Sequence, residues 1–184
     1  MVADHDVIII GTGAGGGTLA RHLAAQNEFE GHRRKEHDMP YPNSPLHIDI
    51  PVKLGDVKTV YSIAALSFEG DLPASLFHMG LITGDIADWG ATSEVVAIFH
   101  TNAGHVTLDD EAYNADRGIE TGNPYKELVT GLMSRGVRVE LCGATAKAHH
   151  YGNEDLIPGI PINTDAMARL TQLVQQGFVK VTEQ

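Results

Sequence analysis

The feature that most constrains the fold is a repeated alternation of short apolar runs with helical patterns after residue 57. Residues 94–99, EVVAIF, form a continuous apolar run typical of a strand inside a parallel sheet. Strands that alternate with helices form right-handed βαβ units, so the sequence predicts an α/β fold with a mainly parallel sheet and helices on both faces. The expected strands are 57–66, 94–99, 137–141, 160–162 and 178–181.

Three helices are expected between these strands. The first covers residues 73–89, where apolar residues recur at helical spacing. The second begins at Asn123 and Pro124, a favourable cap and first residue. The third is capped by Asn163 or Thr164 and ends at Gly177.

The only cysteine, Cys142, follows residues 137–141, which alternate apolar and charged side chains as a strand does. Ligands bind at the carboxyl ends of parallel strands, and a helix start there would direct N–H groups at the sulfur and favour the thiolate. His100 follows residues 94–99 in the same way, so we expect both residues at this edge, with an accessible sulfur. The alternative is that Cys142 is a small buried hydrophobic residue.

The composition narrows the classes of function. The chain has 24 acidic and 13 basic residues and a formal charge of −11, which argues against nucleic acid or an anionic membrane as a main partner. One cysteine excludes an internal disulfide. No apolar run reaches the roughly 20 residues that span a bilayer. The residues before the first apolar run are acidic, whereas the corresponding region of a signal peptide is basic. We expect a soluble, cytoplasmic protein, or a periplasmic one if a leader was removed.

Residues 4–25, DHDVIIIGTGAGGGTLARHLAA, have the pattern of a strand, a glycine-rich turn and a helix start. Gly11, Gly13 and Gly16 follow the GxGxxG spacing that lets a backbone approach a pyrophosphate. The stretch resembles the start of the glucose–methanol–choline oxidoreductases, which implies FAD binding through these glycines. However, residues 27–38 are charged and lack the second strand of a dinucleotide fold. The alternative is a truncated or fused βα fragment, or an appended segment that packs on another surface.

Four prolines in residues 38–56 favour extended backbone and break helices. We therefore predict three parts: a Rossmann-like glycine-rich βα fragment at 1–37, a proline-rich linker at 38–56 and a main domain at 57–184.

Several segments of the main domain carry a family resemblance: FHTNAG (99–104), LDDEAYN (108–114), NPY (123–125) and GVRVELCGATA (136–146). Through them, residues of about 57–184 resemble the DsrE/DsrF-like domain linked to intracellular sulfur oxidation and sulfur relay. The resemblance implies a DsrE-like fold with Rossmann-like layering and a persulfide carried on Cys142. It also implies a sulfurtransferase-type carrier with sulfur donor and acceptor proteins as partners, a homo-oligomer, and no need for a cofactor.

Thiol–persulfide exchange benefits from a group that stabilises the thiolate or moves a proton. His100, His105 and the pair His149 and His150 are the candidates, and their spacing leaves the choice among them open. For the pair, the alternative is a solvated loop.

Three other functions remain open. One is a metal site, although the sequence lacks HxxxH and CxxC spacings. Its ligands would be His100, His105, Cys142 and His149. The second is a non-catalytic oligomeric assembly or small-ligand module of the same fold. The third is flavin or nucleotide binding through Gly11–Gly16.

Overall fold

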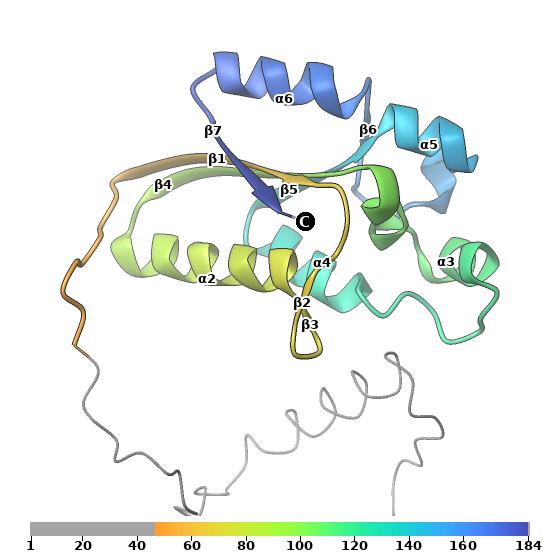
Figure 1. Cartoon of the computed structure of the whole chain (residues 1–184), viewed down its shortest axis with the longest axis horizontal. Coiled ribbons are helices and arrows are strands. Elements are labelled where there is room, and N and C mark those ends of the chain that lie inside the picture. Colours follow the sequence, from red (N-terminus) through yellow and green to blue (C-terminus); the bar gives the residue numbers. More distant parts are fainter. Residues whose placement is uncertain (1–46, 184) are drawn as a thin grey trace, which may run out of the picture. The chain divides into compact units, whose positions relative to one another are not determined.

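The computed structural model describes residues 47–183, and within them five strands form one parallel sheet in the order β6-β5-β4-β1-β7 (Figure 1). The predicted parallel α/β fold is confirmed. The strands are β1 (Asp56–Ile63), β4 (Thr92–Phe99), β5 (Val137–Cys142), β6 (Ile162–Asn163) and β7 (Val179–Glu183). The chain divides into two compact units, Met1–Lys53 and Leu54–Gln184, and the sheet belongs to the second.

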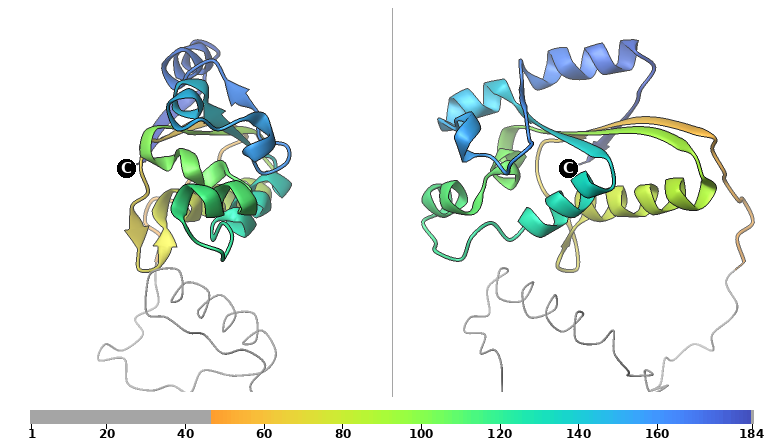
Figure 2. Two further views of the ribbon diagram at one scale, coloured as in Figure 1. Left: turned by 90° about the vertical axis from the view of Figure 1, so that its right-hand side faces the viewer. Right: turned by 180° about the vertical axis from the view of Figure 1, so that it is seen from behind.

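The helices lie on both faces of this sheet, as predicted (Figures 1 and 2). Helices α2 (Ala74–Trp89) and α4 (Lys126–Ser134) pack on one face, and α6 (Ala166–Gln175) packs on the other. Shorter elements complete the connections. They are the hairpin strands β2 (Phe68–Glu69) and β3 (Leu72–Pro73), the helices α3 (Asp110–Arg117) and α5 (Gly143–His149), and the 3₁₀ helices η1 (Thr101–Thr107) and η2 (Asn153–Asp155).

Two apolar cores separate the faces of the sheet. The larger core joins β1, β4 and β5 to α2 and α4, and it takes Val137, Val139 and Leu141 from β5. The smaller core lies under α6 and includes Leu170 and Leu173 of that helix. Because neighbouring residues of a strand point to opposite faces, the remaining side chains of β5 are directed toward α6.

Two predicted helix starts are wrong. Helix α4 begins at Lys126, because the buried Asn123 accepts a hydrogen bond from the N–H of Tyr125 and donates to the carbonyl oxygens of Val106 and Leu108. Helix α6 is capped by Asp165, whose Oδ1 accepts from the N–H of Ala168 at 2.8 Å. In both cases side-chain hydrogen bonds decide among several possible caps.

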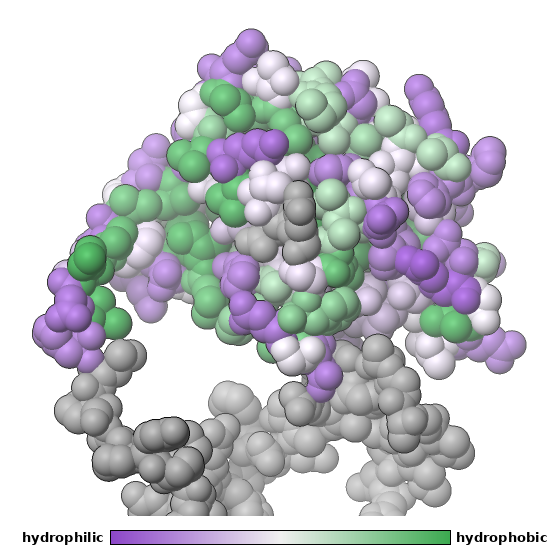
Figure 3. Space-filling view, viewed as in Figure 1, coloured by the Kyte–Doolittle hydropathy of each residue, from purple (hydrophilic) through white to green (hydrophobic). Residues whose placement is uncertain are grey.

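The segment before β1 exposes apolar side chains. Ile48, Ile50, Val52 and Leu54 are between 43% and 81% exposed, and Figure 3 shows apolar side chains along the left margin where this segment runs. These residues belong to neither apolar core.

Candidate functional site

Cys142 is the last residue of β5, and α5 begins at the next residue. Its side chain belongs to the core under α6 and is only 4% exposed. The backbone N–H of Ala166, the first residue of α6, donates a hydrogen bond to the sulfur at 3.2 Å. The strand-end position and a nearby helix start agree with the sequence, but the expectation of an accessible sulfur is wrong, because the start of α6 covers it.

Gly143 explains how α6 can begin so close to the cysteine. A Cβ atom at this position would lie 2.4 Å from the carbonyl oxygen of Asn163 and 2.7 Å from that of Thr164. The segment between β6 and α6 therefore passes directly over the backbone that follows Cys142. Only glycine permits this approach without a shift of one of the two backbones.

His100 and Cys142 follow equivalent positions on neighbouring strands. Phe99 of β4 pairs with Leu141 of β5, so the next residue of each strand is His100 and Cys142, on strands about 4.8 Å apart. The His100 ring is nevertheless engaged elsewhere. Its Nε2 lies 3.0 Å from the Ser62 hydroxyl, and its Nδ1 lies 3.0 Å from Oγ1 of Thr101.

The environment of His100 favours its neutral form. Burial of the ring and, second, the positive charge of Lys180 lower the pKa of His100 below its ordinary value of 6.5. At neutral pH the imidazole can therefore accept a proton. Its predicted roles, to stabilise the thiolate or to move a proton, stay predictions.

The turn after His100 is strained and tied to α5. Thr101 has φ of +52°, a conformation that a β-branched residue rarely adopts. Its N–H donates to Oγ1 of the buried Thr145 at 2.8 Å, which anchors the strained turn. The ends of β4 and β5 are thereby held together at the edge where Cys142 lies.

His105 lies in η1, where its ring contacts the rings of Tyr113 and Tyr125. Burial lowers the pKa of His105 to about 4, and the charge of Arg117 contributes in the same direction. The residues on both sides of it, Gly104 and Val106, are buried, and Val106 belongs to the larger core. These surroundings favour a packing role for His105. They belong to the larger core, whereas Cys142 lies in the core under α6, on the other face of the sheet.

The predicted pair His149 and His150 ends α5. The ring of His149 stacks on that of Tyr151, and His150 adopts the left-handed conformation that closes the helix. Both residues are exposed, which favours the solvated alternative.

A buried charged network lies next to the cysteine. Glu140, two residues before Cys142 on the same face of β5, is only 3% exposed. Arg169 of α6 grips its carboxylate with Nε at 2.9 Å from Oε2 and Nη2 at 2.8 Å from Oε1. Asn163 Nδ2 donates to the same carboxylate at 3.1 Å, and Arg138 Nε lies 3.1 Å from it.

These contacts keep Glu140 charged. Burial alone would raise the pKa of Glu140, but the hydrogen bonds from Arg169 and Asn163 and the charges of Arg169 and Arg138 outweigh it, so the pKa lies below 4.5. A carboxylate paired with two guanidinium groups is stable in a buried position that would otherwise exclude it.

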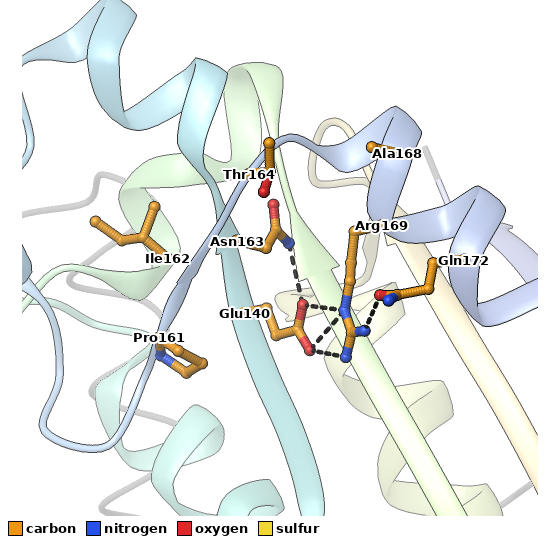
Figure 4. A pocket seen from close by; sticks show the side chains of 8 residues that line it. All are labelled: Glu140, Pro161, Ile162, Asn163, Thr164, Ala168, Arg169 and Gln172. Atoms are coloured by element: carbon orange, nitrogen blue, oxygen red, sulfur yellow. Dashed lines mark hydrogen bonds and ion pairs between the residues drawn. The ribbon is translucent and has the colours of Figure 1, made fainter.

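A hollow of about 510 Å³ opens beside this network, between β6 and α6 (Figure 4). Its lining residues are Glu140, Pro161, Ile162, Asn163, Thr164, Ala168, Arg169 and Gln172. The figure shows Glu140, Asn163 and Arg169 converging across it. The Glu140–Arg169 pair is therefore reached from solvent on one side.

The structure does not assemble the metal site considered above. Among residues 47–183, no group of three or more His, Cys, Asp or Glu side chains is placed to hold a metal ion. Within the same residues, no helix has the length and apolar character needed to cross a membrane.

Comparison with known families identifies the chain. A model of the DsrE/DsrF-like family matches residues 62–182. The chain belongs to the DsrE/DsrF-like family. The match includes Cys142, Glu140 and Arg169, so the network described above lies within the DsrE/DsrF-like domain. A search of curated proteins gave no match.

Solved structures resemble the DsrE/DsrF-like fold at low sequence identity. A protein of unknown function, MTH1491 from Methanobacterium thermoautotrophicum, superposes with a TM-score of 0.52 at 19% identity, over 70% of this chain and 100% of that one. The ychN protein from E. coli gives a TM-score of 0.47 at 19% identity, over 69% and 100% of the two chains. The first likeness supports the fold and nothing further.

The family match gives no support to the flavoenzyme resemblance of residues 4–25, because it begins at residue 62. Gly11, Gly13 and Gly16 lie outside the described residues. Flavin binding through them, and the predicted boundaries of the fragment and the linker, stay predictions.

Glu140, Arg169 and Ser62 of this DsrE/DsrF-like domain were not among the site residues expected from the sequence. A signal for Glu140 was present, because it lies in a strand predicted to have helices on both faces. A carboxylate at such a position is covered and needs a partner. Nothing local in the sequence indicates that the partner is Arg169.

Proposed function

We propose that this DsrE/DsrF-like protein carries sulfane sulfur as a persulfide on Cys142. Family membership supports the proposal, because the resemblance described above assigns that role to the cysteine after this strand. The observation that carries it is the hydrogen bond from the Ala166 N–H to the sulfur at 3.2 Å. A backbone N–H that donates to the sulfur of the thiol can also donate to the thiolate, which is the nucleophile in sulfur exchange.

The exchange needs no external oxidant or reductant. The Cys142 thiolate attacks the outer sulfur of a donor persulfide, R–S–SH, and the donor leaves as the thiolate R–S⁻. The product is Cys142–S–SH. An acceptor thiolate then attacks the outer sulfur, takes it as a new persulfide and returns Cys142 as thiolate.

The chain's own residues contribute through position. The N–H of Ala166 stabilises negative charge on the Cys142 sulfur before attack and after release. His100 lies beside the same strand ends, where its Nε2 is 3.0 Å from the Ser62 hydroxyl and its Nδ1 is 3.0 Å from Oγ1 of Thr101. The partners are sulfur donor and acceptor proteins, and the protein acts as a homo-oligomer.

Intact mass spectrometry tests the proposal. The full chain is exposed to a persulfide donor and compared with Cys142→Ser, which removes the only cysteine. We expect the wild type to gain the mass of one sulfur atom and to lose it when a thiol acceptor is added. The mass of the variant should not change. A wild-type chain that gains no sulfur under conditions that load a known carrier contradicts the proposal.

The 4% exposure of Cys142 favours one second candidate, a non-catalytic assembly module. In that case the thiol serves only as a small apolar side chain under α6. The same experiment separates the two functions, because a module of this kind gains no sulfur although its fold is intact.

A further inference from the structure

The start of α6 lies on the Cys142 sulfur, so whatever fixes this turn controls the sulfur's environment. Ala166 donates to the sulfur, and Asp165 caps the helix through Ala168. Arg169 follows within the first turn and reaches back to Glu140 on β5. Cys142 and Glu140 are two residues apart on the same face of one strand, so the helix start is held at two neighbouring points.

The Arg169–Glu140 contact is the charged one of the two connections between β5 and α6. The bidentate hydrogen bonding of Arg169 to the carboxylate fixes both the distance and the orientation of the helix start relative to β5. Removing one partner of a buried charge pair leaves the other charge without compensation, which is strongly unfavourable. The pair therefore resists displacement of this turn more than a surface ion pair would.

We propose that Glu140 and Arg169 are positioning residues for Cys142. They hold the first turn of α6 so that the Ala166 N–H stays on the sulfur and the sulfur stays covered until this turn moves. The hollow beside the pair gives the Arg169 side chain room to leave the carboxylate (Figure 4). The inference deepens the proposed function, since a carrier must expose its sulfur to both donor and acceptor.

Arg138 provides a matched control within the same network. Its Nε lies 3.1 Å from Oε1 of Glu140, so it forms an ion pair with the same carboxylate that Arg169 contacts. Arg138 lies on β5 itself, whereas Arg169 comes from α6. Replacing either arginine by glutamine removes one positive charge near Glu140, and only Arg169→Gln cuts the connection between strand and helix.

The first readout is the rate at which iodoacetamide alkylates Cys142 in the full chain. Reaction requires local opening of the covering turn, so a weaker tie raises the rate. We expect an increase of about tenfold for Arg169→Gln and a rate near that of the wild type for Arg138→Gln. Arg169→Lys keeps the charge but loses the bidentate hydrogen bonding, so an intermediate rate is expected.

The second readout is the NMR signal of the Ala166 amide proton. In Cys142→Ala the amide loses its sulfur acceptor, which defines the shift of the released state. In Arg169→Gln we expect the Ala166 signal to move toward that position, while the Ala168 amide, capped by Asp165, keeps its own. A loss of general stability would not move Ala166 selectively.

Any one of three results would overturn the inference. The first is that Arg169→Gln is alkylated at the wild-type rate, and the second is that its Ala166 signal does not move. The third is that Arg138→Gln has effects equal to those of Arg169→Gln. If Arg169→Gln does not fold, Arg169→Lys decides by the same readouts, and a wild-type rate counts against the inference. Sulfur loading enters neither readout, so failure of the carrier proposal is distinguishable from failure of this one.

Discussion

The backbone N–H of Ala166 lies 3.2 Å from the sulfur of Cys142, although the two residues are 24 positions apart in the chain. The contact places the amino end of α6 on a side chain that ends β5. The thiol in this position is shielded from solvent and accepts a hydrogen bond from the first residue of a helix.

Gly143→Ala should destabilise the fold. The new Cβ atom would lie 2.4 Å and 2.7 Å from the backbone oxygens of Asn163 and Thr164, which cannot rotate away as a side chain does. We expect the free energy of unfolding to fall by about 2 kcal/mol in urea titrations. Gly131→Ala is the control, because no atom lies within 4 Å of its Cβ position in α4. The free energy of unfolding of Gly131→Ala should rise by up to about 1 kcal/mol through helix propensity. Equal effects of the two substitutions would contradict the prediction.

Glu140 should make the wild type sensitive to acid. Its pKa in the folded protein lies below 4.5, so the unfolded chain binds this proton more readily than the folded one. The stabilisation is complete well above pH 4.5 and is lost as the pH falls through the folded pKa. Glu140→Gln should be less stable at neutral pH and should lose less stability on acidification, measured by urea unfolding at several pH values. Glu94→Gln breaks the exposed pair with Lys58 and serves as the control. An acid slope in Glu140→Gln equal to that of the wild type contradicts this.

His105 should produce a separate pH dependence at milder acidity. Its pKa is about 4 in the folded protein against an ordinary 6.5, so between these values the unfolded chain takes up a proton that the folded chain refuses. Stability therefore falls as the pH drops from 6.5 toward 4. His105→Phe retains a ring between Tyr113 and Tyr125 and removes the titration. Its melting temperature should change less across this interval than that of the wild type, and an identical dependence would show that His105 does not cause it.

Lys180→Gln should raise the pKa of His100. The positive charge of Lys180 is the second cause of the lowered value, and burial of the ring is the first. We therefore expect the pKa of His100 to shift part of the way toward 6.5. An NMR titration of the imidazole C–H signals measures this shift. Lys147→Gln, on α5, is a control with the same change of charge. A pKa of His100 that is insensitive to Lys180→Gln, or equally sensitive to both variants, would remove the assigned cause.

Local patterns in the sequence determined the parallel α/β fold and the place of Cys142 at a strand end. Both follow from short-range information: the run EVVAIF, the alternation in VRVEL and the helical spacing between them. The sequence also carried the family resemblance that the match at residues 62–182 established. These properties depend on residues that are close together in the chain.

Only the tertiary structure decided what surrounds the sulfur. The alternation in β5 shows that Glu140 and Cys142 share a face, but not that α6 covers this face or that Arg169, 29 residues away, meets Glu140. The direction of the His100 ring, toward Ser62 rather than the thiol, was likewise set by side chains from another strand. Burial and hydrogen-bond partners depend on how distant segments pack. For that reason local periodicity predicted both the strand end and the helix α6, but not that the start of this helix covers the sulfur.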